Sequence, residues 1–351
     1  MPLLMSVLMF SCSKDDAPPT PIDPVVPPDT TGVYVMNEGQ YGKNNASITY
    51  YNLTTKNVVA DYYQTVNGHG LGEGANDLKR YGSKIYCVVT GLGDAAQSYV
   101  EVLDLSCKTI KRIAFSNSNG GFQPRSIVFD KNKAYVSAYN GTVSRIDTTA
   151  LTIEATVNAG YGLEGIGIAN NKIYVANSSN TAAPNAVVDV VSVIDIATFT
   201  KLREIKTAYN PYRVAVSASG DVYVACWGNY ADLLPAVSVI NSKVDTVAVT
   251  ANNNIGDLAI AGDKAYVLGD IYTTPYIKSV NLTTRAIGTD FITDPTVIAQ
   301  PYGVTINEKN GDVFITNSPY TGTGSMYVFG VNGKVKYTFE AGLNPRCAVP
   351  F

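Results

Sequence analysis

The hydrophobic positions of this chain recur as short runs that are typical of strands. From Gly32 onward, runs of alternating or β-branched residues are bounded by Asn, Asp, Gly and Ser, which separate strands with turns. No stretch repeats its apolar residues at helical spacing. The pattern therefore predicts an all-β protein.

One phrase recurs along the chain: a polar turn, then an aromatic residue, a β-branched or small residue, and another small or apolar residue. Its aromatic anchors lie 39 to 52 residues apart and are Tyr34, Tyr86, Tyr135, Tyr174, Tyr223, Tyr266 and Phe314. That period is the spacing of propeller blades, each of which is a four-stranded sheet. The sequence predicts a seven-bladed β-propeller over residues 32–351.

The two ends of this segment predict how the ring closes. The chain reaches the first anchor, Tyr34, without an inner strand before it. Residues 344–349 match inner-strand phrases such as residues 210–216. We expect the C-terminal segment to supply the inner strand of the first blade, because this closure removes a free sheet edge.

Residues 1–31 have the pattern of an export signal followed by a spacer. The first ten residues are almost wholly apolar, too few to span a bilayer, and fit the core of a secretory signal. Ser11 and Cys12 follow as in a bacterial lipobox, which predicts lipidation of Cys12 and a signal segment over residues 1–12. Residues 13–31 begin with an acidic tract and carry six prolines, which predicts a semi-rigid surface linker.

Composition narrows the chemistry. The formal net charge is −3 with 16% charged residues, so no basic footprint indicates nucleic acid. The single histidine, His69, disfavours a histidine-dependent metal centre or triad, and the catalytic motifs Gly-x-Ser-x-Gly, His-Glu-x-x-His and the Walker loop are not in the sequence. We expect a binding protein rather than an enzyme, with no cofactor and no metal. The cysteines after Cys12 are expected to be free buried thiols.

The candidate site lies in the loops of one face. In a propeller, the second-to-third-strand loops and the blade-to-blade loops open around the central channel, and here they are rich in Tyr, Asn and Gly. Tyr and Trp give large contact area with a polar tip. The face suits a large, mostly uncharged ligand with amides or hydroxyls. The predicted contacts are Tyr139, Asn177, Trp227, Tyr230, Tyr272, Tyr302 and Tyr320.

Aligning the inner strands adds a second feature at the channel mouth. One register position is predicted to hold Asn76, Arg125, Gly165, Arg213, Asp257, Gly303 and Arg346. The three arginines, Arg125, Arg213 and Arg346, suit a phosphate or carboxylate group of a ligand. They equally suit an internal Arg–Asp network that closes the channel.

The anchors and turns also carry a family resemblance. Tyr-Val-x-Asn phrases, as in residues 174–177, third strands that end Val-Ile-Asp, as in residues 193–195, and the lipobox with its acidic tract resemble the YncE-like, surface-layer-type propeller lipoproteins of Bacteroidetes. That group includes surface lipoproteins that capture cobalamin (vitamin B12) and pass it to a TonB-dependent outer-membrane transporter. The resemblance implies the same location here: the outer membrane, exposed at the cell surface and held by a lipid.

The sequence therefore predicts a non-catalytic surface lipoprotein that binds cobalamin or a related corrinoid and delivers it to a transporter. A corrinoid is large, rich in amides and carries one phosphodiester, which a Tyr/Asn face with an arginine cluster could bind. A glycan-binding lipoprotein and a protein-interaction scaffold on the cell surface remain the alternatives, through the same face.

Overall fold

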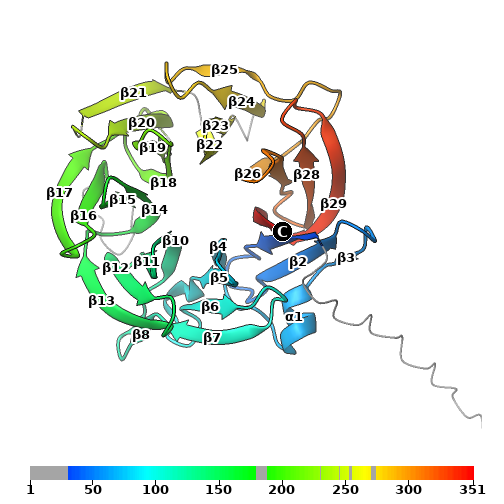
Figure 1. Cartoon of the computed structure of the whole chain (residues 1–351), viewed down its shortest axis with the longest axis horizontal. Coiled ribbons are helices and arrows are strands. Elements are labelled where there is room, and N and C mark those ends of the chain that lie inside the picture. The colour runs from blue at the N-terminus through cyan, green and yellow to red at the C-terminus, as the bar shows by residue number, and fades with distance from the viewer. Residues whose placement is uncertain (1–30, 179–187, 230, 245, 253–254, 270–273) are drawn as a thin grey trace, which may run out of the picture.

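The computed structural model describes residues 31–178, 188–229, 231–244, 246–252, 255–269 and 274–351. Seven four-stranded antiparallel sheets surround a central axis (Figure 1), which confirms the predicted seven-bladed β-propeller. Residues 1–30, with Cys12 and nearly all of the expected linker, lie outside the described residues, as do Tyr230 and Tyr272.

Six blades follow the chain from the innermost strand outward. Blade 2 contains β4 (Ala75–Tyr81), β5 (Lys84–Val89), β6 (Tyr99–Leu103) and β7 (Thr109–Ala114). Blade 3 contains β10 (Pro124–Asp130), β11 (Lys133–Ala138), β12 (Thr142–Asp147) and β13 (Thr152–Asn158). Blade 4 contains β14 (Leu163–Ala169), β15 (Lys172–Asn177), β16 (Val190–Asp195) and β17 (Thr200–Lys206).

The next three blades repeat this order. Blade 5 contains β18 (Pro211–Val216), β19 (Asp221–Cys226), β20 (Ala236–Asn241) and β21 (Thr246–Asn252). Blade 6 contains β22 (Ile255–Ala261), β23 (Lys264–Gly269), β24 (Tyr276–Val280) and β25 (Ile287–Asp290). Blade 7 contains β26 (Pro301–Ile306), β27 (Val313–Asn317), β28 (Thr323–Phe329) and β29 (Val335–Leu343). The short strands β8 (Ser116–Asn117) and β9 (Gly120–Gly121) form a small hairpin between blades 2 and 3.

Blade 1 joins the two ends of the propeller, as the sequence predicted. Its order from the outside inward is β3 (Val58–Val59), β2 (Ser47–Asn52), β1 (Gly32–Asn37) and β30 (Pro345–Pro350). β30 pairs antiparallel with β1, with Val33 opposite Pro350, and the N–H of Phe351 donates to the carbonyl of Gly32. The C-terminal strand therefore closes the ring from its innermost position.

The aromatic anchors tie neighbouring blades together. All seven are buried in the second strands. The hydroxyl of Tyr34 donates to the carbonyl of Leu105 at 3.1 Å, and that of Tyr223 donates to the carbonyl of Leu282 at 3.2 Å. Each acceptor lies in the turn between the third and fourth strands of the next blade. The repeated tyrosine thus combines a buried ring with a hydrogen bond across the blade junction.

One helix departs from the sequence prediction. α1 (Tyr62–Asn67) begins after Asp61, whose Oδ1 accepts from the N–H of Gln64, and ends at Gly68, which has a φ of 77°. Six residues are too few for a hydrophobic period, so the pattern gave no helical signal. β3 has only two residues, and α1 follows it and packs beside β2 (Figure 1), with Tyr62 and Tyr63 buried in the cluster between blades 1 and 2.

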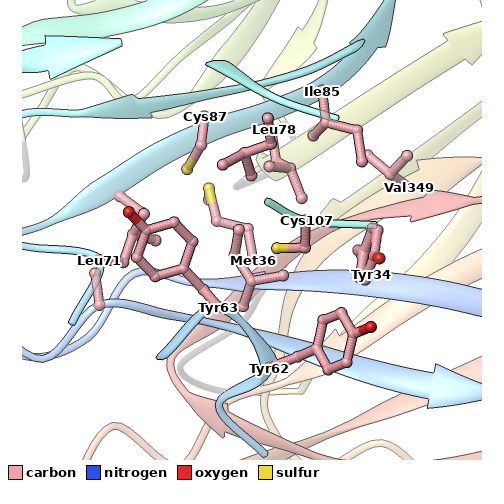
Figure 2. Packing of buried hydrophobic residues seen from close by; sticks show 14 of the residues in the cluster. Tyr34, Met36, Tyr62, Tyr63, Leu71, Leu78, Ile85, Cys87, Cys107 and Val349 are labelled. Carbon is pink, nitrogen blue, oxygen red and sulfur yellow. The ribbon is translucent and has the colours of Figure 1, made fainter. Parts of the chain in front are cut away.

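The core is divided among the blade junctions. Figure 2 shows the cluster between blades 1 and 2, where Met36, Leu78 and Val349 come from strands far apart in the sequence. Cys87 lies opposite Glu101 in the β5–β6 pair, and the four cysteines of the described residues are free thiols, three of them buried and Cys347 half-buried. Among the described residues, no helix is long and apolar enough to cross a membrane.

Candidate functional site

Every inner strand is irregular at the same end. The register with the second strand shifts at the start of β4, β10, β14, β18, β22 and β26, and again between β30 and β1. A β-bulge inserts a residue that has no direct partner and re-aims its side chain. The residues without a Cα partner are Asn76, Arg125, Glu164, Gly165, Tyr212, Gly256, Tyr302, Gly303 and Arg346.

The bulges correct the predicted register. Arg125 and Arg346 are bulge residues, whereas Arg213 and Asp257 lie one position further along and pair with Ala225 and Leu268. The sequence alignment placed these two positions in one register, although the bulge skips a single residue in all four strands. The three arginines still gather at one end of the inner strands, at the centre of the loop face.

Arg125 joins blade 3 to blade 4. Its Nε lies 2.9 Å from Oε2 of Glu164, and the ring of Tyr139 lies 5.8 Å from its guanidinium carbon. Burial alone would lower the pKa of Arg125, but the charge of Glu164 raises it above its usual value. Arg125 therefore stays protonated at neutral pH.

Arg213 joins blade 5 to blade 6. Its Nε donates to Oδ1 of Asp257 at 2.7 Å, and Oδ2 of Asp257 accepts from the N–H of Val304 in blade 7 at 3.1 Å. Burial would lower the pKa of Arg213, and the charge of Asp257 more than offsets this effect. One carboxylate thus fixes three consecutive blades.

Arg346 lies at the junction where the ring closes. Its Nε lies 3.6 Å from Oε1 of Glu38, and the hydroxyl of Tyr302 donates to Oε2 of the same carboxylate at 2.6 Å. The guanidinium carbon of Arg346 lies 4.9 Å from the ring centre of Tyr302. Burial raises the pKa of Tyr302, and the charge of Glu38 raises it further. We call these three arginines with Glu38, Glu164, Asp257 and Tyr302 the axial ring.

The axial ring shows the internal network that was one of the two sequence interpretations. Each arginine contacts a carboxylate, and two of these pairs cross a blade junction. The pairs also interact electrostatically with one another. Burial alone would lower the pKa of Arg346, and the charge of Asp257, which belongs to another pair, raises it. The arginines are still partly open: their side chains are 24%, 24% and 12% exposed.

Aromatic side chains lie beside the axial ring at three places. Trp227 is half-buried and stacks on Tyr212, with ring centres 4.0 Å apart and planes at 20°. Tyr302 meets Tyr320 edge to face at 5.5 Å, and Tyr320 is 37% exposed. With Tyr139, four of the predicted contacts therefore flank the arginines.

Asn177 has a different place from the other predicted contacts. It is buried, its Nδ2 donates to Ser192 Oγ at 3.0 Å, and its Oδ1 accepts from the N–H of Tyr161 at 3.3 Å. Asn37 and Asn317 occupy the same strand position and accept from the N–H groups of Gly342 and Gln300. This asparagine fastens the incoming blade-to-blade loop to its blade, so the side chain is committed to the scaffold.

The sequence did not predict that a buried carboxylate holds the loop between β1 and β2. Glu73 is buried, and its carboxylate accepts from the N–H groups of Gly42 and Asn44 in the β1–β2 loop. Tyr41, at the tip of this loop, is 85% exposed. Glu73 lies in a glycine-rich stretch, residues 67–74, and no sequence spacing links it to residues 42–44.

The same face carries exposed apolar side chains beyond the axial ring. Of the fourteen exposed large hydrophobic residues in the described part of the chain, seven lie in its loops: Tyr41, Leu92, Tyr161, Leu233, Leu234, Val297 and Tyr320. Only Val244 and Val331 lie in the turns of the opposite face. Within the described ranges, no group of three His, Cys, Asp or Glu residues could hold a metal ion.

These observations define a seven-bladed propeller with a paired ionic ring at the centre of one loop face. Residues 31–259 match the family described as "Domain of unknown function (DUF5074)", and the chain belongs to that family. No curated protein matches the sequence.

Two solved structures are similar in fold. A chain titled "Kuenenia stuttgartiensis Hydrazine Synthase" shares 17% identity at a TM-score of 0.55, covering 70% of this chain and 73% of that one. A "putative 6-phosphogluconolactonase" from Bacteroides uniformis ATCC 8492 shares 11% identity at a TM-score of 0.65, covering 92% of this chain and all of that one. At these identities the likeness concerns the fold alone.

Proposed function

We propose that this protein is a non-catalytic, surface-exposed lipoprotein that captures cobalamin or a related corrinoid and delivers it to an outer-membrane transporter. The observation that carries the proposal is the loop face itself. Partly exposed guanidinium groups lie at its centre, and Trp227, Tyr139, Tyr302 and Tyr320 flank them. A large ligand with an apolar ring system and amide-rich edges fits such a surface, because aromatic faces and directed donors are offered together.

The place where the chain enters the propeller supports a role at the cell surface. Gly32 and Phe351 lie together at one end of β1 and β30, whereas Glu38 and Arg346 lie at the other end. The chain therefore enters the propeller on the face opposite the axial ring, and a lipid on Cys12 would tether the protein from that side. The candidate site would point away from its own membrane, toward the medium that supplies the ligand.

The test is a binding experiment with a coloured ligand. Purified protein is mixed with cyanocobalamin, passed over a desalting column and scanned in the visible range. A red protein fraction is expected, and Trp227→Ala should weaken the affinity by about tenfold, because a buried aromatic contact is lost. The matched control is Leu202→Ala, which removes an exposed side chain from the outer strand of blade 4. A colourless wild-type fraction contradicts corrinoid capture and turns attention to glycans.

A protein-interaction scaffold is the second candidate, and one observation favours it. The exposed apolar residues of the loop face occur in blades 1, 2, 5 and 7 and in two blade-to-blade loops, more widely than a small ligand at the axis can cover. A face that holds half of the exposed large hydrophobic residues of the described chain suits contact with a protein. Capture of the transporter by the protein in the absence of any corrinoid, abolished by Tyr41→Ala but not by Val331→Ala, would support this role.

A further inference from the structure

The guanidinium groups of the axial ring are closed on most sides. Arg125, Arg213 and Arg346 all meet their carboxylates through Nε. The rings of Tyr139 and Tyr302 lie 5.8 and 4.9 Å from the guanidinium carbons of Arg125 and Arg346. A guanidinium is a planar fork with five N–H groups, so the edge that remains is the one that carries the two Nη atoms.

That edge is open to solvent. In the part of the chain that the structure describes, the three arginines make their side-chain hydrogen bonds and ion pairs only through Nε. The same part contains one buried side-chain nitrogen or oxygen without a hydrogen-bond partner, Nε of Arg145, so the Nη atoms of the axial ring are not buried without a hydrogen-bond partner. The ring therefore offers unused N–H donors at the centre of the loop face.

The charge of the ring is already compensated. Three guanidinium groups face three carboxylates, those of Glu38, Glu164 and Asp257. Two of these carboxylates are fixed through their second oxygens, by Tyr302 and by the N–H of Val304, and cannot turn away without breaking another bond. Because these carboxylates offset the positive charge of the arginines, an incoming anion gains less Coulomb attraction here than at unpaired guanidinium groups. A neutral acceptor group can bind through hydrogen bonds from the Nη–H donors alone, without any net positive charge.

We propose that the axial ring is a subsite for uncharged acceptor groups, the carbonyl oxygens of carboxamides, which the Nη edges of Arg125, Arg213 and Arg346 bind. The proposal rests on the proposed function and deepens it: the amide edge of the ligand enters the ring, and an anionic group does not. A free phosphate or carboxylate is accordingly a poor ligand of this subsite.

The decisive variant is Arg213→Lys, which keeps the positive charge and can still pair with Asp257 but removes the Nη edge. We expect its affinity for cyanocobalamin to fall by about tenfold, as the loss of one or two hydrogen bonds predicts. Arg112→Lys is the matched control, since Arg112 also pairs through Nε, with Glu101 at 2.6 Å, and lies 3.8 Å from the ring of Tyr99, but belongs to the outer strand of blade 2. Unchanged affinity in Arg213→Lys would show that charge suffices and would overturn the proposal.

A second measurement separates the subsite from the proposed function. The melting temperature of the wild-type protein is followed with increasing inorganic phosphate against sodium chloride of matched ionic strength. We expect the two curves to coincide. A saturable rise with phosphate alone would identify an anion site and overturn the proposal, whether or not cyanocobalamin binds. If cyanocobalamin fails to bind and the curves coincide, corrinoid capture is wrong while the charge-compensated subsite is supported.

Discussion

At the scale of single residues, the features that make this sequence recognisable belong to the scaffold. The asparagine that ends the Tyr-Val-x-Asn phrase holds a blade-to-blade loop, as Asn177 does for Tyr161. The aspartate that ends Val-Ile-Asp accepts the N–H groups of its own turn, as Asp195 does for Thr198. Both residues could be located from the sequence because the phrases that contain them recur in several blades. The partners of the arginines could not, because Glu38 and Glu164 belong to loops and bulges with no common spacing.

Replacing Asn177 tests this scaffold role. In Asn177→Ala the N–H of Tyr161 loses its acceptor, and the hydroxyl oxygen of Ser192 loses a donor while the hydroxyl still donates to the carbonyl of Ala159, which together costs about 1–3 kcal/mol. Urea denaturation should show this loss, with ligand affinity unchanged. The control is Asn140→Ala, since Asn140 is an exposed loop residue of blade 3. A fall in affinity without a fall in stability would instead assign Asn177 to the binding surface.

The turn residue Asp147 gives a pH-dependent prediction. The hydrogen bond from Lys133, with those from its turn, lowers the pKa of Asp147 to about 2. A lowered folded-state pKa contributes stability above the ordinary value and loses it as the pH falls toward 2. Asp147→Asn keeps the turn acceptor, as Asn281 does in blade 6, but removes the charge. We expect a small loss of stability at pH 7 that disappears near pH 2, by thermal unfolding at both values; a constant difference contradicts this assignment.

At the scale of elements, the alternation of apolar residues and the period of the blades predicted the strands. Features that do not repeat along the sequence could not be predicted. The third strand β6 begins and ends where its apolar run does, and Cys87 faces Glu101 as a simple hairpin requires. α1 and the bulges escaped detection for the same reason: a six-residue helix and a one-residue insertion leave no repeat in the sequence. The bulges matter most, since they set which side chains reach the axis.

The C-terminal strand yields the prediction for this scale. Deleting residues 344–351 removes β30, which supplies Ala348 and Val349 to two buried clusters and leaves β1 with an unpaired inner edge. We expect a protein without a cooperative unfolding transition, because an exposed β-edge and an open ring remain. Circular dichroism during heating measures this. The control is Val331→Ala, an exposed turn residue of blade 7. A truncated protein that melts like the intact chain would show that closure is dispensable.

At the scale of the whole molecule, the two faces of the propeller differ in composition. The loop face carries more of the exposed apolar residues, and the lipid tether would enter from the opposite face. Thr321 is exposed on the loop face of blade 7, and Val331 is exposed on its opposite face, where Gly32 begins β1. If the chain is lipid-anchored as proposed, Thr321→Cys should react faster with a bulky maleimide on intact cells than Val331→Cys, because the membrane screens the tethered face. The described native cysteines are buried or half-buried, and the unsubstituted protein corrects for them. Equal rates on purified, delipidated protein are the control. Equal rates on cells would mean that the linker lets the propeller turn freely, and protection of both cysteines would contradict the surface location.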